Sequence, residues 1–452
     1  MVSIFDITLE EFRELIQNKD IKQLRYLADE MHPVDFAELL EQVQLSEALF
    51  IFKTIPKDRT SAIFSYLSLD KQEDLIESFS GPQIKDILEH AQFDDVVDFL
   101  EEMPDEIVRK VLKNASVEQR NEINILLSYQ PDTAGTLLTT EYVELLEEDS
   151  VEDAISKVRE QGKTAASINT CFVVNNNNRL LGIVLLKDIM VSNEESTISE
   201  LMETDIISVN TKDDKEDVVK VFIKYDLSTI PVVNDQYNLV GIITIDDALD
   251  VLEDEATEDI QRMASILPME GSYLNTSVFE MFKSRMPWLL ILMISATFTG
   301  FIISNNDAVL LILPSLYSFI PMLMDTAGNA GSQASAMVIR GIVVDNLNMK
   351  DYFKVLFKEM RTALITGAIL FIINSLRIII FMPSIPFGIA ILVSLTIYFT
   401  IIMANIIGGS LPLLALVFKI DPASMSGPIV TTLVDALALV VYFSVALTYI
   451  QL

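Results

Sequence analysis

The C-terminal part of the sequence contains five apolar runs, each long enough to cross a lipid bilayer as a helix. A spanning helix needs about 20 mostly apolar residues, and the candidate runs are 286–304, 308–340, 361–382, 386–418 and 424–450. Pro and Gly interrupt the long second and fourth runs, and irregular backbone at membrane depth persists only where protein or water covers it. We therefore expect residues 284–452 to form an all-α membrane domain of five transmembrane helices.

Basic residues fall on one side of the five predicted spans. They are Lys283 and Arg285 before the first run, Arg340, Lys350, Lys354, Lys358 and Arg361 after the second, and Lys419 after the fourth. The other two loops, "SNND" (304–307) and "MPSIP" (382–386), contain no Lys or Arg. Because short cytoplasmic loops carry an excess of these residues, we expect the N-terminal part to be cytoplasmic and the C-terminus to lie outside.

Charge divides the chain at the same place as hydropathy. Residues 1–279 carry 57 Asp and Glu against 23 Lys and Arg, whereas the remainder carries eight against nine. Such acidity argues against nucleic-acid binding, which depends on neutralising phosphates, and favours solubility, a cation partner or both. The one cysteine, Cys171, excludes an intramolecular disulfide and is compatible with a reducing cytosol. The start, "MVSIFDITLEEF", lacks the features of a secretory signal.

Residues 1–135 have the pattern of short amphipathic helices with polar-Pro starts. "MHPVDFAELLEQV" (31–43) and "IPKDRTSAIFSYL" (55–67) are examples, with apolar residues three and four positions apart. The pattern predicts a superhelical α-helical N-domain, an array of helical hairpins. An ordinary helical domain fits the same pattern.

Residues 136–253 contain an internal repeat, in which "FVVNNNNRLLGIVLLKDIM" (172–190) aligns with "PVVNDQYNLVGIITIDDAL" (231–249). Each copy is expected to be strand, turn, strand and then a helix that starts at Asp188 or Asp247. The α+β duplication resembles a tandem pair of cystathionine-β-synthase (CBS) domains. The resemblance implies a regulatory role and possible ATP binding, and it assigns no nucleotide-binding residues.

The membrane part carries a carboxylate, Asp435, in the middle of its last apolar run. A carboxylate at membrane depth costs about 2.5–3.5 kcal/mol, which favours a function for it. Several oxygen-bearing side chains are candidates to line an ion path with it: Thr431, Thr432, Asn329, Asp325, Ser332, Gln333 and Asn405. Oxygen ligands without His or Cys favour hard cations such as Mg²⁺ or Ca²⁺. One Asp is too few for a full cage, whereas a two-fold dimer with its pore on the axis supplies two. The alternative is a structural ion pair between Asp435 and Arg377.

Over nearly its whole length the chain resembles the MgtE family of magnesium channels. The most specific segments are "IDDALDVLEDEATEDI" (245–260), "PMLMDTAGNAGSQ" (321–333) and "SGPIVTTLVDALALVVYF" (426–443). The resemblance implies a homodimeric, Mg²⁺-selective channel of the plasma (inner) membrane, in which Asp435 coordinates hydrated Mg²⁺. The better-known family pattern has Asn where this chain has Ser332 and Gly427, Gly where it has Asp325, and an acidic residue where it has Ala62.

The resemblance also implies regulatory Mg²⁺ sites on the cytoplasmic side. The matching residues are Asp94, Asp98, Glu216, Asp226, Asp247, Asp250, Glu255, Glu258 and Asp259, with Asp421 as a partner at the membrane. An acidic connecting helix over 254–283 is expected to carry the signal to the pore. A sensor is physically required, because about 100 mV supplies about 4.6 kcal/mol per Mg²⁺, a gradient of roughly 2000-fold.

Two other functions are compatible with parts of the sequence. A proton-coupled divalent-cation carrier or exporter could use Asp435 as its proton-binding group, and a membrane-anchored nucleotide sensor would transport nothing. We expect no enzyme, because the sequence has no HExxH, no GxSxG and no phosphate-binding Gly loop with Lys. The two histidines, His32 and His90, both fall in the predicted N-domain.

Overall fold

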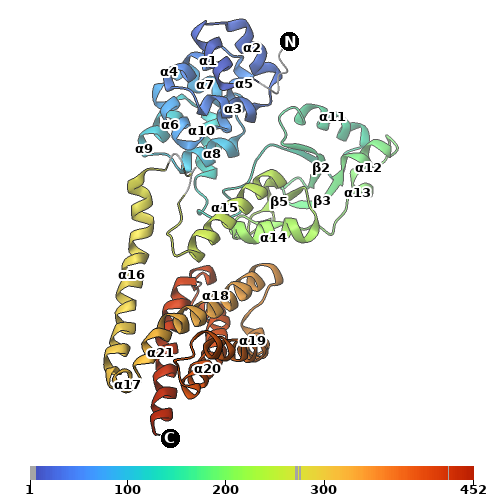
Figure 1. Ribbon diagram of the computed structural model, residues 1–452. Coiled ribbons are helices and arrows are strands. Elements are labelled where there is room, and N and C mark those ends of the chain that lie inside the picture. Colours follow the sequence, from blue (N-terminus) through green and yellow to red (C-terminus); the bar gives the residue numbers. More distant parts are fainter. Residues whose placement is uncertain (1–6, 270–272, 274–275, 426, 452) are drawn as a thin grey trace. The chain divides into compact units, whose positions relative to one another are not determined.

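The computed structural model describes residues 7–269, 273, 276–425 and 427–451. The chain forms two compact units, Met1–Asp254 (unit 1) and Glu255–Leu452 (unit 2). Unit 1 combines helices and two small sheets, and unit 2 is helical wherever it has regular structure in the described part (Figure 1).

Unit 1 begins with the predicted helical N-domain. Its helices are α1 (Leu9–Gln17), α2 (Ile21–Glu30), α3 (Pro33–Glu41), α4 (Leu45–Phe52), α5 (Lys57–Ser65), α6 (Leu69–Ser78), α7 (Gly81–Leu88), α8 (Phe93–Glu101), α9 (Asp105–Asn114) and α10 (Val117–Leu126). Local chemistry explains the boundaries, since Thr8 and Ser116 form capping boxes and Pro33 opens α3. In α5 and α9 the proline, Pro56 or Pro104, stands just before the helix.

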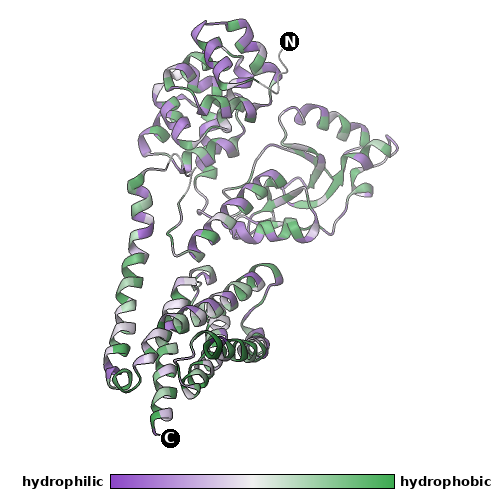
Figure 2. Ribbon diagram, in the orientation of Figure 1, coloured by the Kyte–Doolittle hydropathy of each residue, from purple (hydrophilic) through white to green (hydrophobic). Residues whose placement is uncertain are grey.

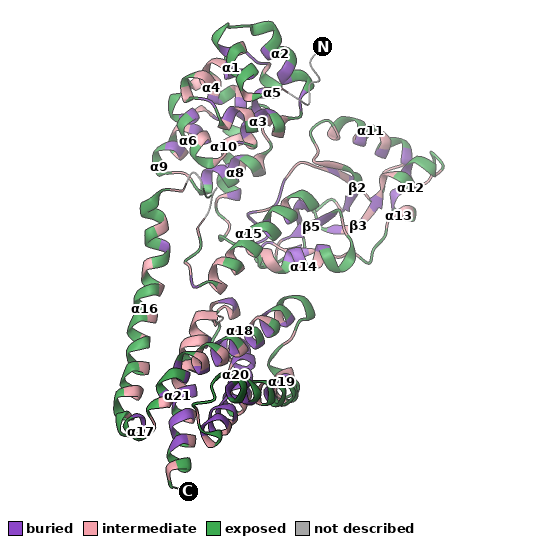
Figure 3. Ribbon diagram, viewed as in Figure 1, coloured by how far each residue is buried: buried purple, intermediate pink, exposed green. Residues whose placement is uncertain are grey.

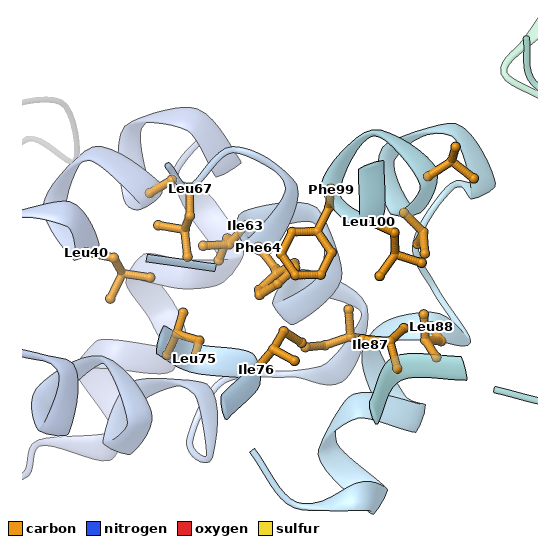
Figure 4. Close-up of a cluster of buried hydrophobic side chains, with 14 of the residues drawn as sticks. Leu40, Ile63, Phe64, Leu67, Leu75, Ile76, Ile87, Leu88, Phe99 and Leu100 are labelled. Carbon is orange, nitrogen blue, oxygen red and sulfur yellow. The ribbon is translucent and has the colours of Figure 1, made fainter. Parts of the chain in front are cut away.

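The helices of the N-domain pack mainly against their next-but-one neighbours. α3 lies against α5, α5 against α7, α7 against α9, α4 against α6 and α8 against α10. Buried side chains fill the space between them, among them Leu40, Ile63, Phe64, Leu75 and Phe99 (Figure 4). This repeated packing is what an array of helical hairpins produces, so the predicted architecture of the N-domain is confirmed.

The second part of unit 1 contains the predicted duplication. The first copy is β1 (Tyr142–Leu146), α11 (Val151–Gln161), β2 (Ser167–Val174), β3 (Leu180–Leu185), α12 (Leu186–Val191) and α13 (Ile198–Leu201). The second is β4 (Val209–Asn210), α14 (Lys215–Tyr225), β5 (Thr229–Val233), β6 (Leu239–Thr244) and α15 (Ile245–Met263). Each sheet pairs its first two strands in parallel and its last two antiparallel.

The register of the two sheets confirms the repeat. Val173 pairs with Gly182 in the first copy, and Val232 pairs with Gly241 in the second. The helices after the hairpins begin at Leu186 and Ile245, two residues before the predicted starts at Asp188 and Asp247. The carboxylates therefore lie within the first turn of each helix.

The predicted connecting segment 254–283 is not one helix. α15 already begins at the end of β6, runs continuously to Met263, and is followed by the non-helical residues 264–269. The next helix starts at Val278 and continues as the first apolar span. The acidic stretch is thus an extension of the last helix of the CBS pair.

Unit 2 contains the apolar helices (Figure 2). Its elements are α16 (Val278–Asn305), α17 (Asp307–Ile312), η2 (Pro314–Phe319), α18 (Ile320–Asp345), η3 (Met349–Asp351), α19 (Tyr352–Phe381), α20 (Phe387–Val417), η4 (Pro422–Met425) and α21 (Gly427–Gln451). Among the described residues, four stretches are long and apolar enough to cross a membrane: α16, Met349–Phe381, α20 and Pro422–Gln451. α18 is a fifth long helix, interrupted in its apolar pattern by Asp325, Arg340 and Asp345.

Two of the predicted spans have different boundaries in the structure. The run 308–340 divides into α17, η2 and α18, because Pro314 cannot continue α17 and begins the short 3₁₀ helix. α19 begins at Tyr352 instead of residue 361, so Lys354, Lys358 and Glu359 lie on a helix and not in a loop. Charged residues in the first turns hide the start of this helix from a search for apolar runs.

α20 is the central helix of unit 2. It packs against both α18 and α19, and its buried residues are distributed along its whole length (Figure 3). Its contact with α18 is a backbone contact, because a Cβ added at Gly408 would lie 2.1 Å from the carbonyl oxygen of Gly331. α18 also packs along α21, and the hydroxyl of Tyr442 donates a hydrogen bond of 2.9 Å to the Leu316 carbonyl in η2.

Candidate ion path and regulatory carboxylates

Asp435 lies on α21, directly against α18. Its Oδ1 is buried and accepts no hydrogen bond from any described residue. The neighbour is Gly328, where an added Cβ would lie 3.1 Å from this oxygen and 2.7 Å from Cγ2 of Thr431. A carboxylate oxygen that is buried without a donor is costly, so Asp435 has the chemistry of a cation ligand.

Hydroxyl groups continue from Asp435 along the contact between α18 and α21. The hydroxyls of Ser332 and Thr431 are 3.0 Å apart, and Thr431 also donates to the Gly427 carbonyl at 2.8 Å. One turn further along α18, Ser335 donates to the Met425 carbonyl at 3.2 Å. The structure therefore brings together three of the predicted path residues, Asp435, Thr431 and Ser332.

The other predicted path residues form a stripe at the edge of this contact. Asp325, Asn329 and Gln333 follow one another at four-residue spacing on α18, and all three are exposed in the single chain. Asp325 is close enough to Asp435 for the two charges to repel each other. The polar surface of α18 is thus continuous with the buried carboxylate.

One sequence interpretation of the membrane part is wrong. Arg377 does not pair with Asp435, because its guanidinium donates to Asn374 Oδ1 at 2.9 Å and lies 2.8 Å from Met322 Sδ. The amide Nδ2 of Asn405 donates to Glu359 Oε2 at 3.3 Å across the α19–α20 contact. Glu359, which the sequence analysis left in a loop, is therefore a further carboxylate on a helix of the membrane part, in addition to Asp325 and Asp435.

In unit 1, carboxylates of the N-domain and of the CBS pair lie near one another. Burial, and next the charge of Asp246, raise the pKa of Asp247 to about 6, although Thr244 donates to its Oδ2 at 2.6 Å. Burial on α8 raises the pKa of Asp95, and the charge of Asp246 adds to it. Burial and neighbouring carboxylates also raise the pKa of Asp250. Neighbouring carboxylates repel one another, and a bound divalent cation would relieve this repulsion, so the cluster is suited to bind one.

Asp95 on α8 is a carboxylate near this cluster that the sequence analysis did not name. The cluster contains Asp95, whereas the predicted residues were Asp94 and Asp98. The side chain of Asp94 lies outside the described residues, and Asp98 is exposed on α8. Adjacent residues point about 100° apart on a helix, so the sequence alone does not show which side chains of α8 face the cluster.

The remaining predicted carboxylates of unit 1 lie on α14. Glu216 forms an ion pair of 2.9 Å with Lys220. Asp226 ends the helix in a left-handed conformation with φ of 52°. Both residues are therefore on a CBS surface, and Glu216 already has a cation beside it.

In unit 2, an arginine lies between two of the predicted carboxylates. Arg262 pairs with Glu258 one turn back on α15, and its Nε is 3.2 Å from Oδ2 of Asp421, which precedes η4. Arg262 thus contacts both Glu258 and Asp421, and the sequence analysis did not consider this cation. Glu255 and Asp259 lie on the same helix and have interactions of their own.

No group of three or more His, Cys, Asp or Glu side chains arranged to hold a metal ion occurs among the described residues of the single chain. The candidate sites therefore consist of one or two carboxylates supplemented by hydroxyls, amides and carbonyls. Mg²⁺ is commonly bound in this way, because it keeps several of its waters.

Family comparisons match all three parts of the chain. The model described as MgtE, divalent cation transporter, matches residues 320–445, the MgtE intracellular N domain matches residues 31–132, and the CBS domain matches residues 134–193 and 198–254. The magnesium transporter MgtE of Thermus thermophilus is 30% identical over 437 residues, which covers 96% of each chain. The Bacillus subtilis protein of the same name is 30% identical over 449 residues, covering 97% of this chain and 96% of the relative.

Two solved structures resemble unit 1. The cytosolic domain of the Mg²⁺ channel MgtE in complex with ATP has a TM-score of 0.51 and 30% identity, and it covers 54% of this chain and 100% of that chain. The soluble part of a magnesium transporter has a TM-score of 0.52 and 27% identity, covering 55% and 98%. With matches to the N-domain, the CBS pair and the membrane helices, and with relatives aligned over nearly the full length, this chain belongs to the MgtE family of magnesium transporters.

Proposed function

We propose that the chain is a Mg²⁺-selective channel of the plasma membrane that imports Mg²⁺ down its electrochemical gradient. The observation that carries the proposal is the buried Oδ1 of Asp435, which has no donor among the described residues and lies against Gly328. The hydroxyls of Thr431 and Ser332 follow it along α21 and α18. These groups are suited to the water shell of a hydrated cation, because hydroxyls and carboxylates accept hydrogen bonds from bound water.

The proposed path requires two chains. Each chain contributes one Asp435 and one exposed stripe of Asp325, Asn329 and Gln333. A two-fold homodimer with its axis along the stripe would place two carboxylates at one depth, which matches the one or two carboxylates that Mg²⁺ usually takes. It would also cover polar side chains that are costly in lipid.

The proposed gate is closed by cytosolic Mg²⁺. Carboxylates that repel one another without Mg²⁺, such as Asp95, Asp247 and Asp250, would be drawn together when the ion binds. Shifting a two-state gate from 1:99 to 99:1 needs about 5.5 kcal/mol of differential binding. Several weakly bound ions can supply this free energy together, and the many carboxylates of unit 1 and α15 provide the positions.

ATP is the ligand that we propose for the CBS pair. A relative's cytosolic domain, which is 30% identical, was solved in complex with ATP. The duplicated β-hairpins and helices of unit 1 have the same fold. Binding of ATP to the full-length protein, measured by isothermal titration calorimetry, tests this assignment.

The decisive experiment measures Mg²⁺ uptake into proteoliposomes under an inside-negative potential. We expect uptake that rises with the potential in the native chain and is lost in Asp435→Ala and Asp435→Asn. Asp307→Asn is the matched control, because Asp307 is an exposed carboxylate at the start of α17, and its uptake should equal the native value.

Three outcomes would contradict the proposal. Uptake that follows a pH gradient and ignores the potential would indicate a proton-coupled carrier, and absence of uptake from folded protein would indicate a nucleotide sensor. Native uptake in Asp435→Ala would remove this residue from the path. The gate has its own test, since Mg²⁺ inhibition of flux that persists after joint Asn substitution of Asp247, Asp250 and Asp259 would exclude the mechanism.

A further inference from the structure

A further carboxylate of the membrane part, Glu359, lies on α19 and faces α20. Its Oε2 accepts a hydrogen bond of 3.3 Å from Nδ2 of Asn405, which is buried. Around it, Phe353, Lys354, Phe357 and Lys358 are exposed on the opposite face of α19. Glu359 is therefore turned toward the protein although charged neighbours of the same helix are turned outward.

Two consecutive glycines of α20 face two different helices. A Cβ at Gly409 would lie 3.0 Å from Cγ of Glu359, so the absence of a side chain there admits the stem of the glutamate. A Cβ at Gly408 would lie 2.1 Å from the carbonyl oxygen of Gly331 on α18. At this level α20 is held between Glu359 on one side and the backbone of α18 on the other.

The contact on α18 is adjacent to the candidate ion path. Gly331 precedes Ser332, whose hydroxyl is 3.0 Å from that of Thr431. Gly331 also borders α21, because an added Cβ would lie 2.9 Å from Cγ1 of Val430 and 3.2 Å from Cγ2 of Val434. Close-packed interiors transmit small shifts. Displacement of α20 would therefore move the part of α18 around Gly331, which is also the part in contact with α21.

We propose that Glu359 is a positioning residue, which sets the spacing between Ser332 and Thr431 by holding α20 against α18. It acts through Asn405, Gly409, Gly408 and Gly331. It does not bind the transported ion, because α20 separates it from the path. The inference rests on the proposed function only for its effect on transport, and the spacing itself can be measured without transport.

The experiment reports this spacing by disulfide formation. In a Cys171→Ser background, Ser332→Cys and Thr431→Cys bring two thiols to positions whose hydroxyl oxygens are 3.0 Å apart. We expect mild oxidation of the full-length protein to link them rapidly. Glu359→Ala should slow the linkage about three- to thirtyfold, the range for changes along a coupled network, whereas Glu359→Gln should retain it because Asn405 can still donate to the amide oxygen.

Two further variants keep the test decisive. Asn405→Ala removes the same hydrogen bond from the other side and should slow the linkage as Glu359→Ala does, which covers the case in which one variant does not fold. Glu280→Ala, which removes an exposed carboxylate in the first turn of α16, is the control and should leave the rate unchanged. Equal linkage rates in the native background, Glu359→Ala and Asn405→Ala would overturn the proposal.

Transport then separates this inference from the proposed function. We expect Glu359→Ala to lower maximal Mg²⁺ flux and the preference for Mg²⁺ over Ca²⁺, and Glu359→Gln to restore both. Loss of flux in Glu359→Gln as severe as in Glu359→Ala would indicate that the charge itself acts on the ion, and would overturn a positioning role. If the linkage behaves as expected while the native chain carries no Mg²⁺, the positioning role stands and the channel proposal fails.

Discussion

Gly328 determines how closely α18 approaches the carboxylate of Asp435. A methyl group at this position would lie 2.7 Å from Thr431 Cγ2 and 3.1 Å from Asp435 Oδ1. The first distance is too short for two carbon atoms, so α18 and α21 would have to separate or Thr431 would have to change rotamer. Small residues thus allow an oxygen-lined path to form between two helices that are in contact.

We expect Gly328→Ala to lower Mg²⁺ uptake about tenfold, because overpacking of this kind costs about 1–3 kcal/mol. Proteoliposome flux measures the effect, and thermal unfolding of the same sample shows whether the fold is retained. Gly300→Ala on α16 is the matched control, since nothing lies within 4 Å of a Cβ added there. Native flux in Gly328→Ala would show that the α18–α21 contact does not border the path.

The identity of the central carboxylate was predictable from the sequence, but its partners were predictable only in part. Asp435 is a charged residue within an apolar run, and the cost of a charge at membrane depth is by itself a reason to expect a function for it. The direction of Arg377 and Asn405 depends on which neighbouring helix each one faces, and periodicity within one helix does not contain that information. The same holds for Asp95, a carboxylate near Asp246 and Asp247 that the sequence analysis did not name.

At the scale of elements, the end of α15 is tied to the segment before α21 by Arg262. This cation lies between Glu258 and Asp421, with its Nε 3.2 Å from Asp421 Oδ2. The three side chains are each about one-third exposed, so each ion pair contributes modestly. We propose that Mg²⁺ binds the same two carboxylates and competes with Arg262 for them.

We expect Arg262→Gln to make the protein more sensitive to cytosolic Mg²⁺. Removing the competitor should lower the Mg²⁺ concentration for half-maximal inhibition of flux by up to about fivefold, the equivalent of about 1 kcal/mol. Arg109→Gln on α9 is the control, because Arg109 also pairs with an acidic residue four positions earlier, Asp105, in an exposed setting. An unchanged or higher inhibitory concentration in Arg262→Gln would contradict the competition.

The types of the elements were better predicted than their limits. The repeat fixed the strands and helices of the CBS pair, because β-branched runs and turn residues recur in both copies. The start of α19 was missed because its first turns are charged, whereas packing against α20 continues the helix beyond the apolar pattern. The connecting helix expected over 254–283 is interrupted instead, because residues 264–269 are not helical.

At the scale of the whole molecule, unit 2 leaves one polar and several apolar surfaces uncovered. The stripe of Asp325, Asn329 and Gln333 is exposed, and so are large apolar residues along α16 and α19 (Figure 3). Lipid can cover the apolar surfaces but not the polar stripe, because polar groups are costly in hydrocarbon. In the homodimer proposed above, a second copy of the chain would cover the stripe.

We expect Asn329→Cys, in a Cys171→Ser background, to form a disulfide-linked dimer on mild oxidation. Ile369→Cys on α19 is the matched control, because Ile369 is 52% exposed but lies on an apolar surface. Gel electrophoresis without reductant measures both variants in native membranes. Equal amounts of linked dimer in the two variants would exclude a two-fold axis along the stripe.

The hydrogen bonds at the two ends of the α18–α21 contact have a consequence for the motion of the proposed gate. Tyr442 holds the Leu316 carbonyl just before α18, and Ser335 holds the Met425 carbonyl just before α21. The two antiparallel helices are thus connected by one hydrogen bond on each side of Asp435. Separating α18 from α21 within one subunit would break these hydrogen bonds. Movement of one subunit relative to the other would break none of them. In the proposed homodimer, the ion path is therefore expected to widen between the subunits, while the α18–α21 pair of each subunit moves as a rigid body.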